Sequence, residues 1–137
     1  MQALRRVPLA GLVLAVAIFL SMPAGSRAAT AGELQTGLAE LQALLDAGRF
    51  VDVLPAGRKL LRRLPDDATV TADDRARVYA LMFEGARRNR DLRGGNSLAA
   101  DLQKADRRRH GEDAVERVPG LYAAARWYEW ADLPERE

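Results

Sequence analysis

Apolar residues beyond residue 30 recur at intervals of three and four, which is the period of a helix face and not the alternation of a strand. Successive stripes run over Leu34–Leu45, Val53–Leu64, Val78–Ala86, Leu98–Ala105 and Leu121–Trp130. Because no β-rich stretch bounded by turns interrupts these stripes, the pattern predicts an all-α domain.

Glycine and capping residues predict where the helices begin and end. Gly48 and Gly111 are typical of the position just after a helix. Thr71 is a typical N-cap, and two aspartates follow it in the first helical turn, where negative charge is favourable. We expect the fourth helix to begin after a glycine pair, with Asn96 or Ser97 as its cap.

Two residues of the second stripe are poor helix formers. Pro55 is tolerable only in the first helical turn, where its missing N–H would have no helical partner. Gly57 costs about 1 kcal/mol relative to alanine in a helix interior. We therefore expect the second helix to begin close to Pro55.

The first 28 residues have the features of a signal peptide. Arg5 and Arg6 precede an uncharged apolar stretch over residues 7–22, and Ser26-Arg27-Ala28 places small residues where a signal peptidase requires them. We expect cleavage after Ala28, leaving residues 29–137 as an exported periplasmic or secreted domain. The alternative is an uncleaved N-terminal helix that anchors an accessory subunit in the membrane, which would be the chain's only membrane contact.

Composition excludes several classes of chemistry. The chain has no cysteine and one histidine, so disulfides, thiolate zinc sites and thiol catalysis are ruled out. His110 lies next to Glu112 and Asp113, but a metal site needs further ligands, and a histidine at a helix end is the simpler interpretation. We expect no catalytic, cofactor or metal site, and therefore no enzyme.

Charge gives no argument for a nucleic-acid partner. The full chain carries a formal net charge of +2, and removal of Arg5, Arg6 and Arg27 with the signal segment changes it to −1. Arginines cluster in three places, at residues 58–63, 87–93 and 107–109. Interspersed acidic residues favour a solvated helix face, and the alternative is an anionic partner such as an acidic protein, a cell-envelope polymer or a phospholipid surface.

The turns between helices recur at a fixed interval. Asp46–Phe50 is followed 42 residues later by Arg88–Leu92 and, after 41 more, by Glu129–Leu133. A constant period of this size indicates stacked helical repeats. A non-repeat helical bundle of similar size is the alternative.

These residues resemble a known repeat family. Leu45–Phe50 and Leu60–Asp67 look like the second half of a tetratricopeptide repeat, with a glycine, an aromatic anchor and a closing proline. Arg109–Asp113 and Leu121–Glu129 are similar to the connector and next helix of the longer, kinesin-light-chain type. The resemblance implies antiparallel hairpins stacked as a short solenoid of about 2.5 repeats over residues 29–137. The alternative is that the chain is a truncated relative of a longer repeat protein.

The resemblance also implies a binding surface for a protein or peptide partner of unknown identity. Five side chains at helix positions expected to face that surface are the candidate partner-binding residues: Tyr79, Glu84, Arg87, Tyr122 and Arg126. The simpler alternative is that the tyrosines belong to the core and the charges are solvated. Trp127 and Trp130 share one side of a helix, which is typical of packing, although an exposed aromatic patch is the other possibility.

Overall fold

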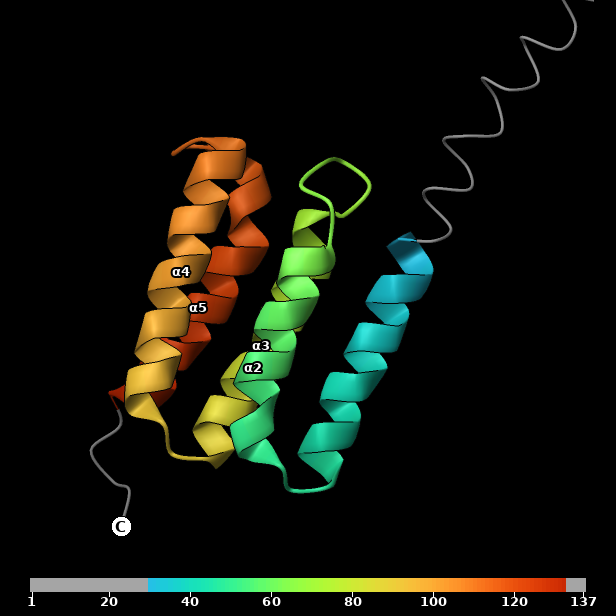
Figure 1. The fold of residues 1–137 in the computed structure, drawn as a ribbon. Coiled ribbons are helices and arrows are strands. Elements are labelled where there is room, and N and C mark those ends of the chain that lie inside the picture. The colour runs from blue at the N-terminus through green and yellow to red at the C-terminus, as the bar shows by residue number, and fades with distance from the viewer. Residues whose placement is uncertain (1–29, 133–137) are drawn as a thin grey trace, which may run out of the picture.

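The computed structural model describes residues 30–132, and within them the chain is built from helices without a strand (Figure 1). The predicted signal peptide lies outside the described residues. The first described helix spans residues 30–46. It is followed by α2 (Phe50–Arg63), α3 (Ala72–Arg88), α4 (Leu92–His110), a 3₁₀ turn (Val115–Arg117) and α5 (Val118–Ala131). The prediction of an all-α domain is confirmed for the described part of the chain.

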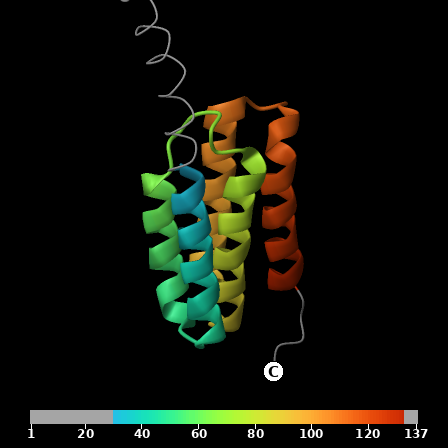
Figure 2. The ribbon, with the colours of Figure 1, turned by 90° about the vertical axis from the view of Figure 1, so that its right-hand side faces the viewer.

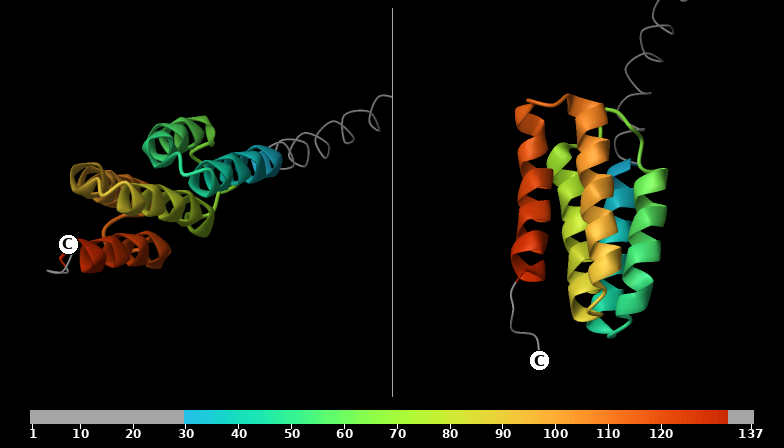
Figure 3. Two further views of the ribbon diagram at one scale, coloured as in Figure 1. Left: turned by 90° about the horizontal axis from the view of Figure 1, so that it is seen from below. Right: turned by 90° about the vertical axis from the view of Figure 1, so that its left-hand side faces the viewer.

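Consecutive helices run in opposite directions, and their axes are nearly aligned with one another (Figures 1 and 2). The helix α3 contacts α2, α4 and α5, and α4 also packs against α5. In Figure 1, α2 lies in front of α3 and α4 lies in front of α5, and the end-on view in Figure 3 shows the same two pairs offset from each other. The helix over residues 30–46 packs closely against α2, as shown at Gly37, where an added Cβ atom would lie only 2.4 Å from the Leu60 side chain.

The core lies between the helices and is almost entirely apolar. Leu41, Val53, Val78, Met82 and Leu98 are at most 1% exposed. Every buried apolar residue except Val70 lies within one of the predicted stripes, as the 3.6-residue period requires. Helix packing is therefore the main source of stability in the described chain.

Most of the predicted helix boundaries are confirmed. Gly48 (φ 71°) lies two residues after the end of the first helix and Gly111 (φ 85°) directly after α4, and both have positive φ. Thr71 and Asp74 form a reciprocal capping box at the start of α3. The expected start of α4 was wrong, because the helix begins at Leu92 and its N-cap is Asp91, whose carboxylate accepts a hydrogen bond from the Gly94 N–H at 2.8 Å.

The expectation for Pro55 was also wrong. The helix α2 begins at Phe50, so Pro55 lies in its second turn. The carbonyl that would have received the missing hydrogen bond belongs to Val51, on the exposed side of α2, where water can reach it. Gly57 has a packing reason, since a Cβ atom there would lie 2.4 Å from the Met82 side chain of α3.

Two turns that lie 42 residues apart in the sequence have the same backbone hydrogen bonds. The Arg49 N–H donates to the Leu44 carbonyl at 2.9 Å, and the Asp91 N–H donates to the Ala86 carbonyl at the same distance. The residues just before them match as well, with Gly48 and Arg90 both at positive φ. Arg90 is the one non-glycine residue at positive φ in residues 30–132, and its conformation follows from this shared turn geometry.

A polar cluster fixes the long loop between α2 and α3. Arg75 is 3% exposed and donates a hydrogen bond to the Pro65 carbonyl. Asp66 lies 3.9 Å from Arg75 and is hydrogen-bonded to Arg109 of α4. The Arg109 hydrogen bond is the main reason why the pKa of Asp66 is below its usual value. The cluster therefore joins the loop to both α3 and α4.

Candidate partner-binding groove

A groove of about 1060 Å³ runs between α3 and α5. Its apolar part is formed by the alanines Ala76, Ala80 and Ala123 and by the aromatic rings of Phe83 and Trp127. The alanine side chains of α3 and α5 are small, so they leave a space between the two helices. The larger side chains along the edges of the groove do not fill this space. The groove opens on the side of α3 that faces away from α2, which packs against the opposite side of α3 through Gly57 and Met82.

Trp127 is the structural centre of this region. Its ring stacks on Phe83 with centroids 5.6 Å apart and lies 4.9 Å from the ring of Trp130. Its indole N–H donates a hydrogen bond of 2.8 Å to the side-chain oxygen of Asn96 in α4. Since Trp127 is only 2% exposed, the packing interpretation holds for this residue, whereas Trp130 is half-buried and lines the groove.

The α3 edge of the groove carries a compact ion-pair cluster. Glu84 accepts two hydrogen bonds from Arg87, at 2.8 and 2.7 Å, and one from Arg88 at 2.6 Å. The Arg87 hydrogen bond lowers the pKa of Glu84 below its usual value, and the same contact raises the pKa of Arg87. Arg88 also lies over the Phe50 ring, 5.8 Å from its centroid. These contacts hold charged groups in place along one edge.

The α5 edge presents an aromatic ring with a cation above it. The Arg126 guanidinium lies 5.9 Å from the Tyr122 ring centroid and donates a hydrogen bond of 3.3 Å to the Tyr122 hydroxyl. That hydrogen bond raises the pKa of Arg126 above its usual value. Tyr122 is 63% exposed, so its ring presents open aromatic surface at this edge. Arg77 of α3 lines the groove as well and makes no ion pair with any described residue.

The structure brings four of the five candidate partner-binding residues together. Glu84, Arg87, Tyr122 and Arg126 all line the groove. Tyr79 does not: it is 6% exposed in the core, and burial raises the pKa of its hydroxyl. For Tyr79 the alternative interpretation, a core tyrosine, is the one that the structure supports.

Sequence reasoning missed the alanines that make the groove. Ala76 and Ala80 are four residues apart and therefore share one side of α3. The sequence signal that could have indicated the groove was this pair of small residues, which are spaced so that they lie on one side of a helix next to charged residues. Without the partner helix, however, that signal cannot distinguish a groove from tight packing, because α5 follows almost forty residues later in the chain.

The described residues contain no arrangement that suggests metal chemistry. Among residues 30–132, no three His, Cys, Asp or Glu side chains are grouped so that they could hold a metal ion. His110 is the last residue of α4, where the sequence placed a helix end. The helices of the described part are also too short or too polar to span a membrane.

Comparison with known proteins returned no relative. None of the protein-family models, curated proteins or solved structures compared with the chain matches it. The class of protein that the described residues define is an all-α stack of antiparallel helices with an open groove between α3 and α5.

Proposed function

We propose that this chain is an exported, non-catalytic interaction module of the tetratricopeptide-like type, and that the groove between α3 and α5 receives a segment of a protein partner. The observation that carries the proposal is the groove itself, with its apolar base and its charged and aromatic edges. An apolar pocket edged by a few oriented polar groups is the usual form of a recognition site.

The two equivalent turns support a repeat architecture. Hydrogen bonds with the same pattern and lengths occur at residues 44–49 and 86–91, at the interval by which the sequence motif recurs. The helices over residues 30–46 and α3 then occupy equivalent positions in successive units, and α5 begins a third unit. In a stack of such units, the first helix of each unit lies on one common side, which is the side of the groove.

The edges of the groove favour a partner segment of mixed charge. Arg77, Arg87 and Arg126 face the opening together with Asp73, Glu84 and Glu129, so positive and negative groups are equal in number. Charges of both signs at fixed positions set the register of a bound segment more than its affinity. The apolar base and the Tyr122 ring supply the burial that drives binding.

Site-specific photo-crosslinking tests this proposal with a matched pair of positions. Tyr122 in the groove is 63% exposed and Val51 on α2 is 69% exposed, so a benzoylphenylalanine at either position is equally accessible. In cells of the source organism, we expect a defined protein adduct from position 122 and none from position 51. The variant Ala80→Arg, which places a long side chain in the groove, should abolish the adduct without loss of helical circular dichroism.

Two outcomes of this experiment contradict the proposal. The first is the same adducts from positions 51 and 122, and the second is the absence of any protein adduct from position 122. Export is tested separately by the intact mass of the accumulated protein. A chain that begins at Ala29 supports export with cleavage, whereas a chain that retains Met1 supports the membrane-anchored alternative.

A further inference from the structure

The outer sides of α2 and α4 carry a concentration of positive charge. Within segments 58–63 and 100–108, the single exposed carboxylate is that of Asp101, which lies 3.6 Å from Arg58. The exposed basic side chains of the two segments, named here the basic face, are Arg58, Lys59, Arg62, Arg63, Lys104, Arg107 and Arg108. The basic face is therefore strongly positive, although the whole chain is close to neutral.

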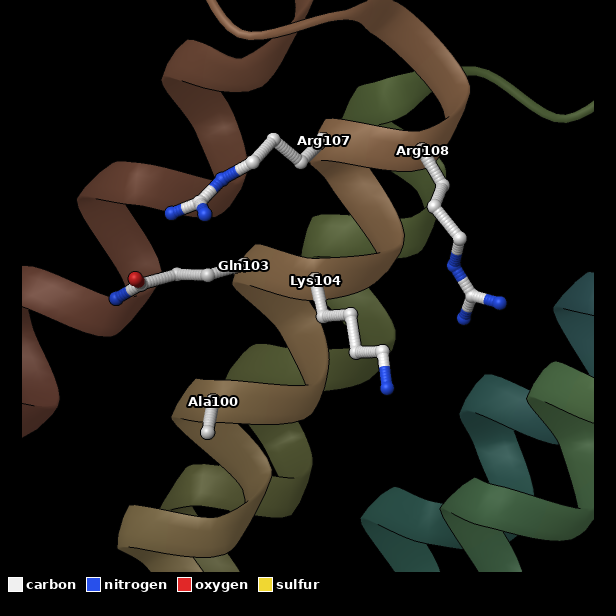
Figure 4. A pocket seen from close by; sticks show the side chains of 5 residues that line it. All are labelled: Ala100, Gln103, Lys104, Arg107 and Arg108. Carbon is white, nitrogen blue, oxygen red and sulfur yellow. The ribbon is translucent and has the colours of Figure 1, made fainter.

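The fold places the two segments together. Both α2 and α4 pack against α3 and run in the same direction, and both face the viewer in Figure 1. The ion pair between Arg58 and Asp101 links them directly. Figure 4 shows Gln103 and Arg107 extending to one side of α4 and Lys104 and Arg108 to the other, around a shallow depression of about 480 Å³ at Ala100.

Most of these cations form no ion pair with a described carboxylate, although the charge of Arg108 acts on Asp66 from a longer distance. No carboxylate of residues 30–132 lies within 4.0 Å of the basic groups of Lys104, Arg107 or Arg108, and the same holds for Lys59, Arg62 and Arg63. Arginines that form ion pairs do occur next to this face, as Arg109 does with Asp66. What distinguishes the basic face is that several cations without an ion pair lie on two helices that pack against the same helix.

Helix-end electrostatics explain only part of this charge. Cations in the last turn of a helix interact favourably with its dipole, which accounts for Arg62, Arg63, Arg107 and Arg108. Lys104 lies more than a turn before the end of α4. Moreover, the helix dipoles do not explain why two helix ends that both carry positive charge lie beside each other, because these charges repel one another. An anionic ligand removes that repulsion.

We propose that the basic face binds the surface of a membrane that contains anionic phospholipid, through the phosphate groups of the lipid head groups. The cations are spread over two neighbouring helices, as contact with a broad charged surface requires, rather than gathered in one deep pocket. Segments 58–63 and 100–108 contain no aromatic side chain on which a nucleic-acid base could stack. This proposal is independent of the proposed function of the groove.

The contact is electrostatic and involves no insertion. The exposed apolar residues of these helices, Val51 and Leu92, lie at their N-terminal ends, away from the basic face. Each basic residue near an anionic surface then contributes a factor of about 5 in binding, and high salt weakens the attraction. Salt-sensitive, reversible binding that requires anionic lipid is the expected behaviour.

A fluorophore at a single cysteine locates the contact, because the chain has no cysteine of its own. Ala100→Cys carries the label on α4 about one helical turn from Lys104 of the basic face, and Ala125→Cys carries it on an exposed position of α5 as the matched control. The full-length protein is mixed with vesicles that contain a head-group quencher, made from phosphatidylcholine alone or with phosphatidylglycerol. We expect quenching at position 100 only with phosphatidylglycerol and only at low salt, and no quenching at position 125.

A charge comparison gives the second readout. The triple variant Arg62→Gln, Arg107→Gln, Arg108→Gln should reduce the phosphatidylglycerol-dependent quenching constant about 100-fold. A control triple at Arg77, Arg90 and Arg126, also changed to Gln, removes the same charge outside α2 and α4 and should reduce it less than about 5-fold.

Three outcomes overturn the proposal. These are equal losses in the two triple variants, quenching at position 100 that does not depend on phosphatidylglycerol, and the absence of phosphatidylglycerol-dependent quenching from a protein that binds a soluble polyanion such as heparin. The last result would assign the basic face to a soluble polyanion. Any attachment through the apolar N-terminal segment is the same in every variant and does not affect the comparison.

Discussion

The close contact between Gly95 and Trp127 leads to a quantitative prediction. In an exposed helix interior, glycine is about 1 kcal/mol less favourable than alanine, so Gly→Ala substitutions commonly stabilise a helix. At position 95, however, a Cβ atom would lie 1.9 Å from the Trp127 ring, far inside van der Waals contact. We therefore expect Gly95→Ala to destabilise the protein.

The magnitude follows from what Trp127 must give up. The ring is held by its stack on Phe83 and by the hydrogen bond of 2.8 Å to Asn96, so it cannot rotate away without losing both. Overpacking a core position costs about 1–3 kcal/mol, and loss of one hydrogen bond adds about 1 kcal/mol. After subtraction of the helix-propensity gain, we expect a net loss of about 1–3 kcal/mol in the free energy of unfolding.

Chemical denaturation monitored by circular dichroism measures this loss, and Gly32→Ala is the matched control. Gly32 lies in the helix over residues 30–46, and no atom lies within 4 Å of a Cβ placed on it, so its substitution should be neutral or stabilising. The double variant Gly95→Ala, Trp127→Leu should show a favourable coupling energy, because the smaller side chain makes room for the methyl group. Stabilisation by Gly95→Ala alone, or additive effects in the double variant, would refute the close packing of α4 on α5.

Three further substitutions test the charged and capping groups. Thr71→Ala removes one half of the capping box with Asp74 and should lower the free energy of unfolding by about 1 kcal/mol, as measured by urea denaturation. Arg75→Met leaves the Pro65 carbonyl without its hydrogen-bond donor and should cost about 1–3 kcal/mol in the same assay. Burial raises the pKa of Asp106 above the usual 3.8, so ionisation of this carboxyl reduces stability as the pH rises through its raised pKa. Asp106→Asn should therefore have a higher Tm than the parent at neutral pH, and this advantage should vanish as the pH falls below 3.8; a constant difference in Tm across that range would contradict the assignment.

Local chemistry explains which helix boundaries could be predicted from the sequence. The capping box of Thr71 and Asp74 joins residues three apart, so its signal is complete within a few residues. The start of α4 was missed because the glycine pair beside Asn96 has the composition of a turn. The structure shows that Gly95 belongs to the helix and is required by Trp127, which lies 32 residues later and in another helix. Because Gly95 and Trp127 are so far apart in the chain, the residues around Gly95 do not indicate this contact.

Helical spacing explains the partial success at the groove. Glu84 and Arg87 are three residues apart and lie on one side of α3, as Tyr122 and Arg126 do on α5 at a spacing of four. Tyr79 is five residues from Glu84, which at 3.6 residues per turn corresponds to about 140° around the helix. This spacing alone separates the two side chains, and the structure accordingly places Tyr79 in the core. The groove also needs α5 beside α3, which no spacing within either helix can reveal.

The distribution of charge, more than its sum, distinguishes the two surfaces of this molecule. The groove edges carry equal numbers of positive and negative groups, whereas the basic face has a single exposed carboxylate among its cations. Surface charges are largely screened beyond about 10 Å at ordinary salt concentration, so a ligand responds to the face that it contacts and not to the net charge of +2. Because the groove opens on the side of α3 away from α2, occupation of one surface leaves the other accessible. Variants on the two faces should therefore separate protein binding from lipid binding, and a substitution such as Arg62→Gln that impaired both would show that the surfaces are coupled through the helices between them.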